Sequence, residues 1–292
     1  MVNGVIGDTL KAQKSALAIP MRLVGEPAGD KLCILVHGIF DTVHTWRFSK
    51  NGDKDYGTLL KRDFGYTPLY LAYNTGLHIS TNGQELARLL TRLWRDNPGK
   101  FKKIIFIGHS MGGLVIRSAC HYGKRRRAPW VKHVKKIFFL STPHLGSDWE
   151  KLGHLTTVIL NWMPELWSRG IANLGNRRSA GIKDLRFGYL VDEDWRGLRE
   201  KALWHDNRHQ VPLLPRVDYY NLASIMAKET SNFFTDYWGD GLVHLRSAAG
   251  KSYVRSKSLP FLPEHFKKFS GYSHTRVTHD GRIYRQIKKW CQ

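Results

Sequence analysis

The chain has 292 residues, and its 42% hydrophobic content suffices for one large core, so we expect a single domain over residues 1–292. Its formal net charge of +22 favours anionic partners, but no zinc-finger spacing, RNA-recognition signature or basic zipper accompanies that charge, so we do not expect a nucleic-acid partner. The three cysteines have no metal-ligand spacing, and charges at Asp8 and Lys11 interrupt the N-terminal segment. No apolar stretch approaches the roughly 20 residues of a membrane-spanning helix. These features together predict a cytoplasmic protein.

Short hydrophobic runs alternate with helix-like segments through the first half of the chain. The runs are almost continuously apolar and rich in β-branched or aromatic residues, which is typical of parallel strands covered on both faces. This alternation predicts an α/β fold with a mainly parallel sheet covered by helices. The predicted strands of this half are residues 31–38, 67–74, 102–109 and 134–142.

The clearest helix is predicted between the second and third of these strands, over residues 82–100. Leu86, Leu89, Leu90 and Leu93 form one apolar stripe at helical spacing, and an Asn-Pro-Gly sequence ends the segment. This stripe should pack against the sheet.

The second half begins with a segment of different character. Residues 148–212 are rich in tryptophan and leucine, then irregular and charged, and predict an insertion of helices and loops over the sheet. A strand over residues 216–226 and a last helix over residues 282–290 follow. The tryptophans expected on the buried face of the insertion are Trp149, Trp162 and Trp167.

The segment "IIFIGHSMGGLVIRSA", residues 104–119, carries the first candidate for chemistry. It reads as a strand, a tight turn and a helix, with Ser110 at the turn. Glycine at 108, 112 and 113 gives the room that a strained corner needs, which is the nucleophile-elbow pattern. We therefore predict that Ser110 is a catalytic nucleophile.

Such a nucleophile needs hydrogen-bond donors for an oxyanion. The backbone N–H of Met111 is one candidate, because it begins the next helix. Gly38 allows a sharp turn after the first strand, so that Ile39 can supply the second N–H, with Phe40 as the neighbouring alternative.

Three motifs in this order, "VHGIF", "GHSMGG" and "STPHLGS", resemble the α/β-hydrolase fold and in particular its bacterial lipases and esterases. The resemblance covers most of the chain outside the insertion. It implies a triad in the chain order Ser, Asp, His, with the acid after a late strand and the histidine before the final helix.

The acid is expected at Asp240, which lies in a "GDGLV" turn similar to a loop of such lipases; Asp236 is the nearby alternative. For the histidine, His274 has the position that the resemblance implies. His279 remains as an alternative, although it directly precedes the last helix, where polar residues commonly form a cap. His265 is expected at the surface.

Further residues are expected to line or support the substrate site, namely Phe40, His109 and His144. No carboxylate or cysteine stands at ligand spacing from these histidines, so no metal site is predicted. The insertion over 148–212 would form a helical cap with an apolar inner face, comparable to a lipase lid and suited to a hydrophobic acyl group.

These residues predict a serine carboxylic-ester hydrolase that uses Ser110, His274 and Asp240, forms an acyl-enzyme and needs no cofactor. An acyltransferase or thioesterase with the same triad is an alternative within catalysis. A binding protein on a hydrolase scaffold, which uses its basic surface, is the alternative outside it. The basic surface could also bring an esterase to an anionic membrane.

Overall fold

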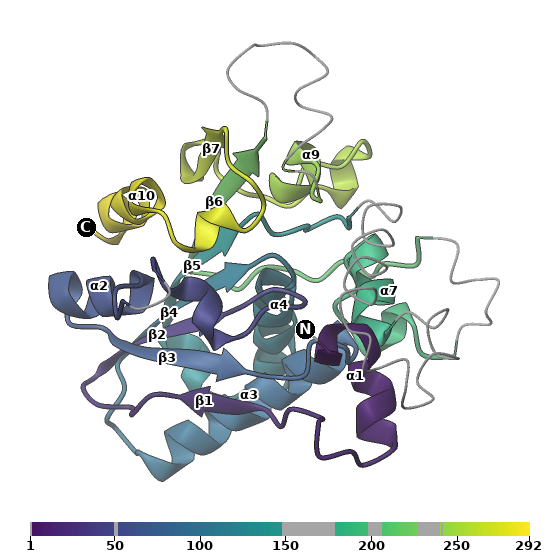
Figure 1. The fold of residues 1–292 in the computed structure, drawn as a ribbon, viewed down its shortest axis with the longest axis horizontal. Coiled ribbons are helices and arrows are strands. Elements are labelled where there is room, and N and C mark those ends of the chain that lie inside the picture. The colour runs from purple at the N-terminus through teal and green to yellow at the C-terminus, as the bar shows by residue number, and fades with distance from the viewer. Residues whose placement is uncertain (1, 50–51, 148–178, 198–205, 227–239, 241) are drawn as a thin grey trace.

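The protein is built around one seven-stranded sheet (Figure 1). The computed structural model describes residues 2–49, 52–147, 179–197, 206–226, 240 and 242–292. The strand order is β1-β3-β2-β4-β5-β6-β7, and only β1 is antiparallel to its neighbour. The strands are β1 (Arg22–Val24), β2 (Lys31–Val36), β3 (Thr67–Ala72), β4 (Lys103–His109), β5 (Val134–Leu140), β6 (Asp218–Ile225) and β7 (Phe266–Ser270).

Helices cover both faces of this sheet, which explains the continuous hydrophobicity of its strands. One face packs against α1, α3, α4 and α7, and the other packs against α2 and α10 (Figure 1). Along β2 the side chains alternate, with Ile34 in the first core and Leu35 in the second. The helices are α1 (Val2–Ala12), α2 (Tyr56–Phe64), α3 (Ile79–Asp96), α4 (Met111–Arg125), α7 (Ala180–Phe187), α9 (Leu245–Ala248) and α10 (Gly281–Cys291).

The five predicted strands and three predicted helices are all present, with ends that shift by a few residues. The structure adds elements that no pattern indicated. The edge strands β1 and β7 are only three and five residues long, and half-exposed or exposed positions dominate both, so neither has a strong hydrophobic period. Helix α1 packs closely on the fold, because a Cβ on Gly4 would lie 2.3 Å from the ring of Phe40.

Helix α3 begins three residues earlier than predicted. The carboxylate of Asp184, on α7, accepts a hydrogen bond from the N–H of Ile79 at 2.8 Å and contacts His78 Nδ1 at 3.0 Å. A carboxylate at this place satisfies an N–H that the helix itself leaves unpaired. The first turn of α3 is therefore stabilised by a residue more than a hundred positions away.

Most of the predicted cap lies outside the described residues, including its three tryptophans, so a cap over 148–212 stays a prediction. The described part consists of residues 179–197 and 206–212. Within it, α7 lies beside α1 (Figure 1), and Ser179 donates a hydrogen bond to the carbonyl of Gly4 at 2.6 Å. None of the helices that the structure describes is both long and apolar enough to cross a bilayer.

Candidate active site

Ser110 occupies the corner between β4 and α4. Its backbone adopts φ 51° and ψ −125°, which is strained for a residue other than glycine. The corner is held by the N–H of Ser110, which donates to the carbonyl of Leu140 on the neighbouring strand at 2.9 Å. Helix α4 approaches the sheet so closely that a Cβ on Gly112 would lie 2.1 Å from the carbonyl oxygen of Val36. The strained corner therefore depends on the absence of a side chain at 112.

The loop after β2 lies directly against Ser110. A Cβ on Gly38 would lie 3.0 Å from the Cβ of Ser110, so the backbone of this loop is within reach of the serine. Among the described residues, the N–H groups of Ile39 and Met111 donate to no carbonyl or side chain. Both predicted oxyanion donors are thus available. Phe40, the alternative, adopts φ 65° and packs its ring against α1.

Asp240 and His274 form a buried pair. His274 Nδ1 donates to Asp240 Oδ2 at 2.7 Å, and Ser224 donates to the same oxygen at 2.7 Å. The second oxygen, Oδ1, accepts the N–H groups of Leu242 at 3.2 Å and Val243 at 2.9 Å. The carboxylate is therefore fixed in orientation, and the proton on Nδ1 leaves Nε2 of the neutral ring free to act as a base.

The pKa values of the two partners move in opposite directions. Burial by itself raises the pKa of Asp240, but the charge of His274 and the hydrogen bonds lower it to about 2. Burial by itself lowers the pKa of His274, but the charge and hydrogen bond of Asp240 outweigh burial, so the pKa lies above its ordinary value. Asp240 is therefore ionised at neutral pH, and it strengthens His274 as a base.

His109, the residue before Ser110, connects three parts of the site. Its Nε2 donates to the backbone carbonyl of His274 at 3.0 Å, and its Nδ1 lies 3.2 Å from Asp41 Oδ2. The rings of His109 and His274 lie 4.9 Å apart between their centroids. Burial raises the pKa of Asp41, but the hydrogen bond and charge of His109 produce a net lowering. His109 thus joins the loop of His274 to the loop that carries Ile39, one of the two predicted oxyanion donors.

Sequence reasoning missed Asp41, Ser224 and Ser141. Ser141 adopts φ 47°, and its Oγ lies 2.6 Å from Ser224 Oγ. Ser141 therefore positions the hydroxyl of Ser224, which in turn donates to Asp240. Ser141 stands in the "STPHLGS" motif, which offered a signal for it. Ser224 lies inside β6 and had no local signal, because its partners are 16 and 83 residues away.

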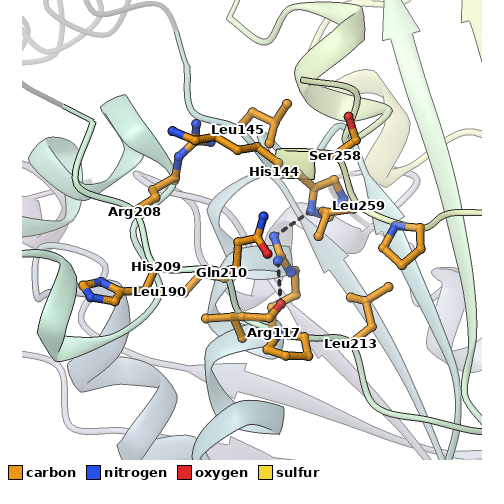
Figure 2. Close-up of a pocket in the computed structure, with 15 residues that line it drawn as sticks. Arg117, His144, Leu145, Leu190, Arg208, His209, Gln210, Leu213, Ser258 and Leu259 are labelled. Carbon is orange, nitrogen blue, oxygen red and sulfur yellow. Dashed lines mark hydrogen bonds between the residues drawn. The ribbon is translucent and has the colours of Figure 1, made fainter. Parts of the chain in front are cut away.

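His144 is placed differently from the other predicted lining residues. It is buried, and its Nε2 lies 3.0 Å from Asn221 Oδ1. It lines a cavity whose described lining includes none of Ser110, Asp240 and His274 (Figure 2). His144 therefore lines a cavity whose described lining does not include the predicted triad.

The alternative residues have other contacts. His279 Nδ1 lies 2.9 Å from the hydroxyl of Thr278, and the following Asp280 caps α10 by accepting the N–H of Arg282. His265 is half-buried and packs its ring against Tyr220. Asp236 lies outside the described residues.

Residues 26–187 match the model of a family described as "Putative serine esterase (DUF676)". This range covers more than half of the chain. No curated protein matches the chain in sequence.

Solved structures resemble the fold over nearly the whole chain. The mature lipase BlEst2 of Bacillus licheniformis is 18% identical, with 93% of this chain and 97% of that chain covered and a TM-score of 0.54. An α/β hydrolase fold protein of Chitinophaga pinensis is 13% identical, with 94% and 93% covered and a TM-score of 0.50. At such identities the likeness concerns the fold, which is that of an α/β hydrolase, as predicted.

Proposed function

Because this chain belongs to the DUF676 family, we propose that it is a carboxylic-ester hydrolase in which Ser110 is the nucleophile, His274 the base and Asp240 the orienting acid. The observation that carries this proposal is the buried pair of His274 and Asp240, with Nδ1 and Oδ2 2.7 Å apart. A histidine held in this tautomer presents Nε2 as a proton acceptor. The strained backbone of Ser110 supports the assignment of the nucleophile.

The reaction proceeds in two halves. Ser110 Oγ attacks the ester carbonyl while its proton passes to His274 Nε2, and Asp240 stabilises the charged ring. The N–H groups of Ile39 and Met111 bind the oxyanion, and the imidazolium then protonates the leaving alcohol. Water attacks the acyl-enzyme with His274 again as base, and the acid is released with Ser110 restored.

The substrate that we propose is an ester with a hydrophobic acyl group. The tryptophan-rich sequence of residues 148–212 supports this choice, and so does the name lipase of the Bacillus licheniformis protein, whose fold this chain shares. Transfer of the acyl group to another alcohol or thiol would use the same residues. The nature of the acceptor in the second half-reaction separates the two activities.

Hydrolysis of p-nitrophenyl esters of graded acyl length tests the proposal. Ser110→Ala should lower kcat at least about 10⁴-fold, because the nucleophile is lost. Ser256→Ala, at an exposed serine, is the matched control and should keep full activity. Equal rates of hydrolysis in Ser110→Ala and the wild type would contradict the proposal. If an added alcohol is converted to a new ester and no free acid is released, the enzyme is an acyltransferase.

We also propose that the basic surface brings the enzyme to anionic lipid. One group of basic residues surrounds a depression of about 520 Å³ at the amino ends of β2, β4 and β5. Burial and the positive charges of neighbouring lysines lower the pKa of Lys103 in this group, which indicates mutual repulsion that an anion would relieve. The group consists of Lys31, Lys102, Lys103, Lys135, Lys136 and Arg216.

A further inference from the structure

A cavity lies beside α4 (Figure 2), and its described lining includes none of Ser110, Asp240 and His274. It has a volume of about 400 Å³ and includes Arg117, two helical turns after Ser110, in its lining. At roughly 30 Å³ for each water-sized group, such a cavity holds on the order of a dozen non-hydrogen atoms. This is the size of a small ligand.

Arg117 carries a buried charge that no acidic side chain in the described part of the chain neutralises. Its exposed fraction is 6%, and no carboxylate of a described residue forms an ion pair with it. Its two hydrogen bonds are long: NH1 lies 3.5 Å from His144 Nδ1 and NH2 lies 3.4 Å from the carbonyl of Val211. Within the described part of the chain, Nε has no hydrogen-bond partner. An unpaired buried charge is costly, and a bound anion would compensate it.

The neighbours of Arg117 cannot take the place of an anion. Burial lowers the pKa of His144 well below its ordinary value, and the charge of Arg117 lowers it further, so the ring is neutral. Arg208, also in the lining, is already paired with Asp206 through contacts of 2.9 and 2.7 Å. Lys257 adds a positive charge to the lining, and none of the lining residues described is acidic.

The other walls of the cavity are mainly apolar. Leu145, Leu190, Leu213 and Leu259 lie around the guanidinium of Arg117 (Figure 2). The buried cation of Arg117 beside aliphatic side chains matches a ligand with an anionic head group and a short hydrocarbon part. A guanidinium binds a carboxylate through two parallel hydrogen bonds, so a carboxylate is the matching head group.

We propose that this cavity binds the carboxylate of a short aliphatic acid, with Arg117 as the residue that recognises the anion. The site is separate from the triad and does not depend on hydrolytic activity. Binding should stabilise the folded protein, because the ligand would neutralise the buried charge of Arg117.

Isothermal titration calorimetry with octanoate tests the proposal, with Arg117→Met as the variant. Methionine has a similar length and removes the buried charge, a replacement that folded proteins often tolerate. Octanoate should bind the wild type and raise its Tm, and Arg117→Met should weaken binding about ten- to a hundred-fold, since a hydrogen-bonded charge is lost. Arg92→Gln, at an exposed arginine of α3, is the matched control and should bind octanoate like the wild type.

A second variant keeps the test decisive if Arg117→Met fails to fold. Leu213→Glu places a carboxylate at the half-buried wall of the cavity, where it should neutralise Arg117 and abolish octanoate binding. Octanol, which has no charge, and inorganic phosphate, which has no hydrocarbon part, should each bind at least ten-fold more weakly than octanoate. Unchanged octanoate affinity in the variants, no binding to the wild type, or equal affinity for octanol or phosphate would overturn the proposal.

Discussion

The carboxylate of Asp240 accepts hydrogen bonds on both oxygens from two side chains and two backbone N–H groups. Such a carboxylate has a fixed position and stays ionised, so it can select one tautomer of His274 and stabilise the protonated ring. This geometry supports the proposed roles of His274 as base and Asp240 as orienting acid, and each role can be tested by substitution.

Asp240→Asn should lower kcat by on the order of 10³–10⁴-fold while the protein stays folded. The amide keeps the shape of the side chain but cannot fix the Nδ1–H tautomer or stabilise the imidazolium. Steady-state kinetics on a p-nitrophenyl ester measure the effect, and Asp218→Asn, at an exposed aspartate, is the control. A loss of less than about ten-fold in Asp240→Asn would show that Asp240 is not the orienting acid.

The pH profile of kcat/KM should have an acid limb with a midpoint above 6.5, the ordinary pKa of histidine. Asp240 raises the pKa of His274, and only the neutral ring can accept the proton of Ser110. Activity should therefore be lost as the pH falls through this raised pKa. The charge of Asp41 also raises the pKa of this ring. A midpoint at or below 6.0 would contradict the charge pairing described for His274.

His109→Ala should lower kcat by up to about 10²-fold with little change in KM. The variant removes the hydrogen bond to the His274 carbonyl and the contact to Asp41, so the base and the oxyanion loop lose their fixed spacing. His109→Gln, whose amide can replace one hydrogen bond, should recover part of the rate. A wild-type kcat in His109→Ala would show that His109 does not position His274 or the loop of Asp41 for the reaction.

The sequence predicts Ser110, Asp240 and His274 as site residues because each stands in a recognisable motif or at a place that the fold implies. It could not identify Ser224 or Asp41 in the same way. Ser224 lies on β6 and meets Asp240 16 residues later in the chain, and Asp41, in the loop after β2, meets His109 at the end of β4. Contacts of this kind arise from tertiary packing and leave no local pattern.

At the scale of elements, the position of α4 depends on how closely it approaches β2. Gly112→Ala should lower the free energy of unfolding by at least about 1–3 kcal/mol, because the new Cβ would lie 2.1 Å from the Val36 carbonyl. Chemical denaturation measures the change. Gly281→Ala is the matched control, since no atom lies within 4 Å of its added Cβ, and it should leave stability unchanged or slightly higher. Equal effects of both substitutions would contradict the close packing.

Elements were predictable where a strong hydrophobic period marks them, as for β4, β5 and α10. The start of α3 was not, because its cap comes from Asp184 on α7. The edge strand β1 has only three residues, and its partner β3 supplies the hydrogen bonds that define it. Short edge strands are set by their neighbours more than by their own sequence.

For the whole molecule, the basic group around Lys31 and Lys103 and the proposed nucleophile Ser110 lie at opposite ends of the sheet. Ser110 follows the carboxyl end of β4, whereas Lys31 and Lys103 begin β2 and β4. Contact of the basic group with a membrane would therefore leave the triad facing away from the lipid, so a soluble ester should be hydrolysed equally well in the bound and free states.

Replacing Lys102 and Lys135 by glutamate should reduce binding to vesicles that contain anionic lipid, without changing hydrolysis of a soluble ester. Each basic residue near such a surface contributes about 1 kcal/mol, and binding should fall steeply as salt rises. Vesicle sedimentation measures this, with Arg88→Glu and Arg92→Glu together as a charge-matched control on α3. Binding that is independent of salt, or lost equally in the control, would contradict a specific role of this group.

Covalent labelling by a fluorophosphonate probe, followed by peptide mapping, tests most directly whether Ser110 is an activated nucleophile. The account predicts one label per chain on the peptide that contains Ser110, with labelling strongly slowed in Asp240→Asn. A protein that remains unlabelled, or that carries the label on another serine when Ser110 is intact, would contradict the assignment of this site.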